Sequence, residues 1–384
     1  MAVQCCLRKI ESYDRNIIRG ALEECLAGLP GGGPPFRSGD RVLLKPNLLS
    51  GRAPERVVNT HPEVIAAVAE SLSDCGCRLS LGDSPGLESL AHALHKAGYM
   101  PVLQRYGIAV ADLHPGEDVP SRNRRWFSRL FLSSRLAEFD HLVNLPKFKT
   151  HGMMTLTLAV KNLFGLVPGK RKAAYHLSAG VDQATFARLM LEIGETCAPA
   201  LSVLDGIVAM EGDGPGQGRP RPAGVLAVST HALALDAVAG ALAGVPPESH
   251  PIVWQAIQHG LPGARLGEVE VIGESIASLA IPDFKLPSTV DPHWRLPGFV
   301  QRGLKNWTSA RPRILPDACR KCLECVRICP AEAIQPSNDG KLRVDPARCI
   351  RCFCCHEICP HQAIAIEPGR GRQVLNLLRG RKQR

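Results

Sequence analysis

The chain has 384 residues, of which 45% are apolar and 21% charged, and its formal net charge is +10. This length exceeds one ordinary hydrophobic core, so we expect two domains, one of which can be small. An aromatic content of 5% argues against base stacking, so we expect no nucleic acid partner. The sequence contains no run of 18 or more apolar residues, so we expect no transmembrane segment.

The amino-terminal stretch MAVQCCLRKIESYDR lacks the basic segment followed by an apolar segment that is typical of a signal peptide. The sequence therefore predicts a cytoplasmic protein in a reducing compartment. There, 15 cysteines indicate metal or redox chemistry rather than a framework of disulfides.

Strand and helix patterns alternate along the first 275 residues or so. The expected strands are 41–49, 78–85, 108–113, 141–145, 201–205, 224–229 and 269–273. The expected helices are 61–76 with Thr60 as N-cap, 90–98, 156–164, 181–193, 231–242 and 252–260. This alternation predicts an α/β domain over residues 1–280, with a mostly parallel sheet and flanking helices. The segment 213–222 predicts a mobile loop over a site.

The residue composition changes after this domain. Recurrent prolines predict a linker over 281–316, with a short helix near 300–307 as its one regular element. A small cysteine-rich domain is expected over 317–368, and a basic tail follows over 369–384.

The cysteine-rich segment contains one motif twice, as CRKCLECVRICP and CIRCFCCHEICP. Each copy spells C-x2-C-x2-C-x3-C-P, in which three thiolates wrap one iron–sulfur cubane and the fourth reaches the other cluster. Zinc sites use separated cysteine pairs, which fit this pattern poorly. The spacing predicts a small α+β ferredoxin-like domain with two [4Fe–4S] clusters. The expected ligand sets are Cys319, Cys322, Cys325 with Cys359, and Cys349, Cys352, Cys355 with Cys329.

Cys354 is a spare cysteine, because it breaks none of the ligand spacings. It is either a plain thiol packed near a cluster or a thiol whose S–H tunes the cluster potential. The neighbouring His356 is expected at the surface rather than as a ligand.

Polar side chains gather where the apolar strands of the α/β domain end. In open α/β sheets the ligand crevice lies outside the carboxyl ends of the strands, so we expect a site there. The residues concerned are Lys45, Asn47, Asp83, Ser84, Asn144, Lys147, Lys149, His151, Asp205, Glu211 and Asp213. Lysines and His151 would hold an anionic ligand, and Asp83, Asp205 or Glu211 would transfer protons or bind a divalent ion. The segment 165–172, GLVPGKRK, departs from a phosphate-binding loop and is expected to be a solvated basic turn.

The block NLPKFKTHGMMTLTLAVKNLFGLVPGKRKAAYH, with GDSPG before it and VLDGIVAMEGDGPGQG after it, resembles the family of domain of unknown function 362. The segment CFCCHEICP is similar to the ferredoxin module that many members carry. The resemblance extends over residues 3–275 and 317–367. It implies an α/β domain fused to a bacterial-type double-cluster ferredoxin, and it carries over the ligand cysteines but no catalytic residue.

Two functions remain open from the sequence. The first is an iron–sulfur oxidoreductase that passes electrons to a small anionic substrate at the strand ends. The alternative is a non-catalytic electron carrier whose α/β domain docks a redox partner. A regulatory or nucleic-acid-associated role is disfavoured by the low aromatic content.

Overall fold

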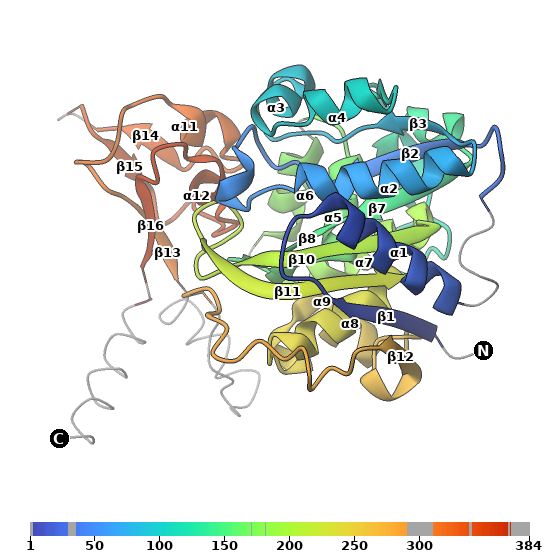
Figure 1. The fold of residues 1–384 in the computed structure, drawn as a ribbon. Helices are drawn as coiled ribbons and strands as arrows, with labels where there is room; N and C mark the ends of the chain where they lie inside the picture. Colours follow the sequence, from blue (N-terminus) through green and yellow to red (C-terminus); the bar gives the residue numbers. More distant parts are fainter. Residues whose placement is uncertain are drawn as a thin grey trace.

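The structure, a computed structural model, describes residues 3–29, 36–169, 171–180, 182–289, 310–337, 340–367 and 369. Ten strands form one sheet in the first domain, in the order β12-β1-β11-β10-β7-β2-β3-β4, with β8 paired to β10 and β9 (Figure 1). Six of its pairings are parallel, so the predicted mostly parallel α/β sheet is confirmed. The bounds are β1 Val3–Lys9, β2 Arg41–Pro46, β3 Arg78–Leu81, β4 Ala109–Val110, β7 His141–Leu145, β8 Lys147–His151, β9 Thr155–Thr157, β10 Leu201–Glu211, β11 Arg219–Ser229 and β12 Val269–Gly273.

Helices cover both faces of this sheet, because successive strand residues point to opposite faces and both sets are apolar. On β2, Val42 and Leu44 join one core while Leu43 joins another. The first core contains α1 and α2, and the cores of the opposite face contain α5 to α9. The helix bounds are α1 Arg15–Gly28, α2 Pro62–Asp74, α3 Leu90–Lys96, α4 Met100–Arg105, α5 Ala159–Asn162, α6 Arg171–Ala179, α7 Gln183–Cys197, α8 Ala232–Leu242 and α9 Pro251–Gln258.

Several local predictions differ from the structure. The expected elements did not include β1, α1, α4, β8, α6 or the separate hairpin of β5 (Gly116–Pro120) and β6 (Arg129–Ser133). Residues 156–157 belong to β9 rather than to a helix, and 219–222 belong to β11 rather than to a loop. The N-cap of α2 is His61, because the Thr60 hydroxyl donates to the carbonyl of Leu145 instead.

The C-terminal region is a small α+β unit built from two similar halves. Strand β13 (Arg311–Ile314) pairs with β16 (Ile364–Glu367), and β14 (Ile334–Pro336) pairs with β15 (Leu342–Val344). Each cysteine motif contains a short helix, α11 (Glu324–Ile328) or α12 (Cys354–Ile358), and these helices contact each other. Helix α12 lies on the side that faces the large sheet (Figure 1).

The segment between the two domains is only partly linker-like. Ile281 and Phe284 are buried in the core of the α/β domain. Residues 311–314 form β13, a strand that the recurrent prolines had argued against. Pro312 is tolerated there because β13 is an edge strand. The helix expected near 300–307 lies outside the described residues, as does the basic tail except Gly369. Among the described helices, none has the length and apolar character that a membrane span requires.

Candidate functional site

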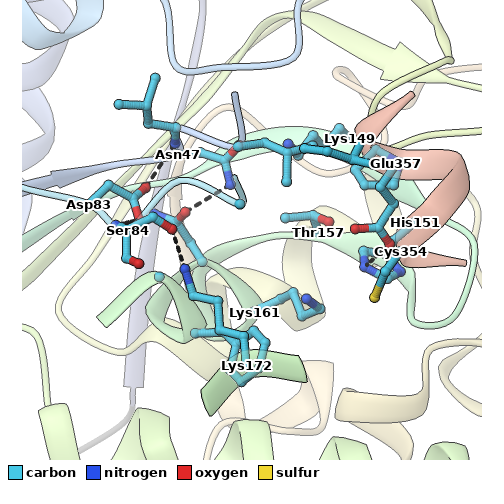
Figure 2. Close-up of a pocket in the computed structure, with 18 of the residues that line it drawn as sticks. Asn47, Asp83, Ser84, Lys149, His151, Thr157, Lys161, Lys172, Cys354 and Glu357 are labelled. Atoms are coloured by element: carbon cyan, nitrogen blue, oxygen red, sulfur yellow. Dashed lines mark hydrogen bonds and ion pairs between the residues drawn. The ribbon is translucent and has the colours of Figure 1, made fainter. Parts of the chain in front are cut away.

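A pocket lies where the carboxyl ends of β2, β3 and β8 meet helices α11 and α12 of the C-terminal region (Figure 2). Its cavity measures about 130 Å³. The α/β domain supplies most of the polar wall, and Ile328, Cys354, Glu357 and Ile358 close the opposite side. The polar residues of the wall are Lys45, Asn47, Asp83, Ser84, Lys149, His151, Thr157, Lys161, Asn162, Lys172, His176, Cys354 and Glu357.

Lys45 and Asp83 form a buried ion pair at one end of the pocket. They end neighbouring parallel strands, which brings Lys45 Nζ to 2.7 Å from Asp83 Oδ2. Lys45 also donates to the carbonyl of Pro46 and to Asn162 Oδ1, and Asp83 accepts from the Leu48 N–H. Burial lowers the pKa of Lys45, and the charge of Asp83 opposes this effect. The pair is therefore a fixed and internally neutral part of the wall.

Lys149 and His151 reach the pocket from β8. Lys149 Nζ donates to the Val58 carbonyl at 2.7 Å, and burial lowers its pKa to about 7. His151 Nδ1 accepts from the N–H groups of Met153 and Met154, so the proton of the neutral ring lies on Nε2. That nitrogen is 3.3 Å from Glu357 Oε1 of α12. Burial lowers the pKa of His151 well below its usual value, which favours this neutral form.

Two further lysines line the pocket, and the sequence analysis did not select either one. Lys161 projects from α5, with Nζ 5.1 Å from the ring centre of Phe164, and burial lowers its pKa. Lys172 projects from α6 and donates to the Ser84 carbonyl (Figure 2), and burial lowers its pKa to about 8. The expectation of a solvated basic turn at 165–172 is therefore wrong for Lys172. The strand-end rule missed both lysines because they lie on helices.

The remaining candidates lie elsewhere and have structural partners. Lys147 and Asp205 form a fully buried pair at 2.8 Å, and Asp205 also accepts from the Tyr13 hydroxyl and the His61 N–H. Glu211 binds Arg219 and the Lys285 N–H. Of the polar strand-end residues named from the sequence, those that line the pocket are Lys45, Asn47, Asp83, Ser84, Lys149 and His151. Those that do not are Asn144, Lys147, Asp205, Glu211 and Asp213.

The nine clustered cysteines gather around α11 and α12. Burial raises the pKa of Cys325 to about 11, and the charges of Cys359, Cys319 and Cys322 add to this shift. Burial likewise raises the pKa of Cys355, with contributions from Cys352, Cys349, Cys329 and Cys325.

The thiolate environment also fits a cluster. The N–H groups of Ala333 and Ala363 point to Cys329 Sγ and Cys359 Sγ, each at 3.3 Å, which is the kind of contact that stabilises cluster-bound sulfur. In the described part of the chain, no three His, Cys, Asp or Glu side chains are arranged to hold one ion. A cubane poses a different requirement, since it spreads its thiolates over separate irons.

The two cysteine motifs differ in what covers them. Leu323 and Phe353 occupy equivalent left-handed positions, with φ of 62° and 61°. Leu323 is 46% exposed beside the exposed Cys322, whereas Phe353 is 6% exposed in a cluster with Ala310 and Ile366. Around these two equivalent positions, the second motif therefore packs more closely against its surroundings than the first.

The loop 212–217 holds α12 against the α/β domain. Gln217 Nε2 donates to the His356 carbonyl at 2.5 Å, and a Cβ on Gly216 would overlap the Glu357 carbonyl oxygen. His356 is buried, with its ring nitrogens 2.7 Å from the Ile364 carbonyl and 3.1 Å from that of Asp213. The expectation that His356 is a surface residue is therefore wrong. The loop, expected to be mobile, is in contact with α12.

Comparison with known proteins agrees with this two-part construction. The model of a 4Fe-4S dicluster domain matches residues 311–360, which supports an iron–sulfur electron-carrier role. Two solved structures show distant likeness. One is a Thermotoga maritima protein with a TM-score of 0.34 at 10% identity, over 53% of this chain and 52% of that one. The other is the lactate racemase apoprotein of Thermoanaerobacterium thermosaccharolyticum, with 0.35 at 14% identity, over 60% and 55%. The chain thus spans little more than half the length of either solved protein.

A thylakoid-associated protein of Synechocystis sp. is 38% identical over 286 residues, which are 74% of this chain and 88% of that protein. The family model described as domain of unknown function 362 matches residues 42–241. These residues contain β2, β3 and β8 and helices α5 and α6, which supply most of the polar wall. The chain therefore belongs to the family of domain of unknown function 362.

Proposed function

We propose that this protein is an iron–sulfur oxidoreductase that delivers electrons to a small anionic molecule bound between its two domains. The observation that carries this proposal is the shared pocket. One of its walls is α12, which contains Cys355 and the spare Cys354, and the opposite wall carries the lysines of the α/β domain. Tethering both parts in one chain raises the effective concentration of donor and acceptor.

The cysteines would hold two [4Fe–4S] clusters. The first set is Cys319, Cys322, Cys325 and Cys359, and the second is Cys349, Cys352, Cys355 and Cys329. When bound, such clusters supply and accept single electrons. The proximity of the thiols is compatible with these crosswise sets, because Cys325 lies near Cys359 and Cys355 lies near Cys329, although Cys355 also lies near Cys325 of the other set.

The remaining residues of the pocket would bind and orient the acceptor. Lys149, Lys161 and Lys172 attract negative charge, and Lys45 is held in place by Asp83. His151 presents its Nε2–H toward Glu357. Apolar side chains on the two domains, Leu48, Phe164 and Ile358 among them, exclude water and strengthen these electrostatic contacts.

Cluster re-oxidation tests the proposal directly. The intact protein, isolated without oxygen, is reduced with dithionite and separated from excess reductant, and small anions are then added one by one. We expect at least one to restore the oxidised absorbance, and Lys149→Met to slow this reaction while Lys285→Met, a change of an exposed lysine outside the pocket, does not. If no member of a broad anion panel re-oxidises the clusters, the electron-carrier alternative is favoured instead.

A further inference from the structure

The charged groups around the pocket do not balance. The acidic side chains that face it are Asp83, after β3, and Glu357, on α12. Four lysines face them, namely Lys45 on β2, Lys149 on β8, Lys161 on α5 and Lys172 on α6. Lys45 is neutralised by Asp83, and Glu357 lies closest to His151 and acts on Lys149 and Lys161. The wall therefore carries two positive charges in excess when its lysines are protonated.

Lys161 and Lys172 have the weakest local compensation. Lys161 contacts the rings of Phe164 and Phe186, and in the described part of the chain it has no hydrogen bond or ion pair. Lys172 donates to a carbonyl, that of Ser84, rather than to a carboxylate. Both residues are half-buried. A half-buried ammonium group without a carboxylate in contact is only partly compensated, so both positions favour a ligand that brings negative charge.

The wall also offers unused hydrogen-bonding atoms. Asn47 Oδ1, Thr157 Oγ1 and His176 Nδ1 are buried and form no hydrogen bond within the described structure. All three residues line this one pocket. Thr157 Oγ1 and His176 Nδ1 can donate a hydrogen bond to an anion, whereas the Asn47 oxygen only accepts. Because buried polar atoms are rarely left without partners, the two donors indicate a ligand that accepts hydrogen bonds.

We infer that the pocket binds a small dianion, either a doubly charged oxyanion or a dicarboxylate, with Lys161 and Lys172 as its charge partners. The inference rests on the proposed function, because it names the class of molecule that the same pocket takes. A cavity of about 130 Å³ has room for roughly four waters at about 30 Å³ each, which sets the scale of the ligand.

Sulfate and methanesulfonate form a matched pair of probes, because both are tetrahedral at sulfur with at least three oxygens and they differ by one charge. Calorimetric titration of the intact, cluster-loaded protein should show sulfate binding roughly tenfold or more tighter, since the second charge lies in a partly dehydrated site. Lys161→Met should abolish this preference, and Lys96→Met, a change of an exposed lysine outside the pocket, should leave it intact. Lys172→Met provides the same test if the Lys161 variant does not fold.

The pH dependence provides an independent readout. Lys149, with its pKa lowered to about 7, and Lys172, with its pKa lowered to about 8, lose their charge as the pH rises. Burial also lowers the pKa of Lys161, so this charge partner is lost in the same direction. His151 and His176 are neutral throughout, because burial lowers the pKa of each. Sulfate stays doubly charged, so its affinity should be highest below pH 7 and fall by about tenfold per lysine for each pH unit above the pKa of the free group.

The outcomes separate this inference from the proposed function. Equal affinity for the two probes, unchanged in both lysine variants, would overturn the dianion. If a neutral or singly charged molecule then re-oxidised the clusters, the oxidoreductase would stand with another substrate class. Tight, lysine-dependent sulfate binding in a protein whose clusters no dianion re-oxidises would support the site and count against the electron-transfer proposal.

Discussion

The buried pair of Lys147 and Asp205 offers a sharp test of which strand-end residues are structural. Asp205 is 0% exposed and accepts three hydrogen bonds, at 2.8 Å from Lys147 Nζ, 2.9 Å from the Tyr13 hydroxyl and 2.8 Å from the His61 N–H. Asp205→Ala leaves an ammonium group that is 1% exposed without its counter-charge. Breaking a buried pair in this way costs about 3–5 kcal/mol, and the two orphaned donors bring the loss to roughly 5 kcal/mol.

Thermal unfolding of the anaerobic protein, followed by circular dichroism, measures this loss. At about 2–4 °C per kcal/mol, the Asp205→Ala variant should melt roughly 10 to 20 °C below the wild type. The double variant Lys147→Met, Asp205→Leu removes both charges together and should recover most of the difference. Sulfate affinity of the folded variants should stay within about twofold of wild type, because neither residue lines the pocket. A variant Asp205→Ala with a normal melting temperature and no anion binding would refute the structural assignment.

Three further changes test other parts of the molecule. Gly216→Val should displace α12 and raise the protease sensitivity of the junction between the domains. Gly267→Val is the control, because Gly267 has open space around it, and it should leave the digestion unchanged. Equal digestion of the two variants would contradict the contact between Gly216 and the Glu357 carbonyl. Asp236→Ala removes the acceptor for the N–H groups of Ala159 and Val160, which begin α5. The free energy of unfolding measured in urea should fall by about 1–3 kcal/mol. An unchanged midpoint would show that water replaces the carboxylate. Cys354→Ser should keep the iron and sulfide content of the wild type, and a loss of iron would make Cys354 a ligand.

The sequence predicted the large architecture well because strand and helix periodicities are local properties. It also placed Lys45, Asp83, Lys149 and His151 at one edge, since the ends of parallel strands converge there. The same rule selected Lys147 and Asp205, which end strands just as the others do. Only the packing of Tyr13 and His61 around them distinguishes a buried structural pair from a ligand site.

The second wall of the pocket could not be read from the sequence. It depends on α12 docking near residue 86 and loop 212–217, and no local pattern encodes a contact between segments more than a hundred residues apart. Lys161 and Lys172 were missed for a related reason. A lysine on a short helix is usually solvated, whereas these two are half-buried where they line the pocket.

The duplicated cysteine motif is used in two different ways within this one chain. The α/β domain and strand β16 cover the Phe353 copy, so that copy is packed at the contact between the two domains. The Leu323 copy keeps its hydrophobic tip in solvent beside Cys322. In the described part of this chain, the Leu323 side of the small domain is therefore the more accessible to another protein, whereas the Phe353 side is held against the α/β domain.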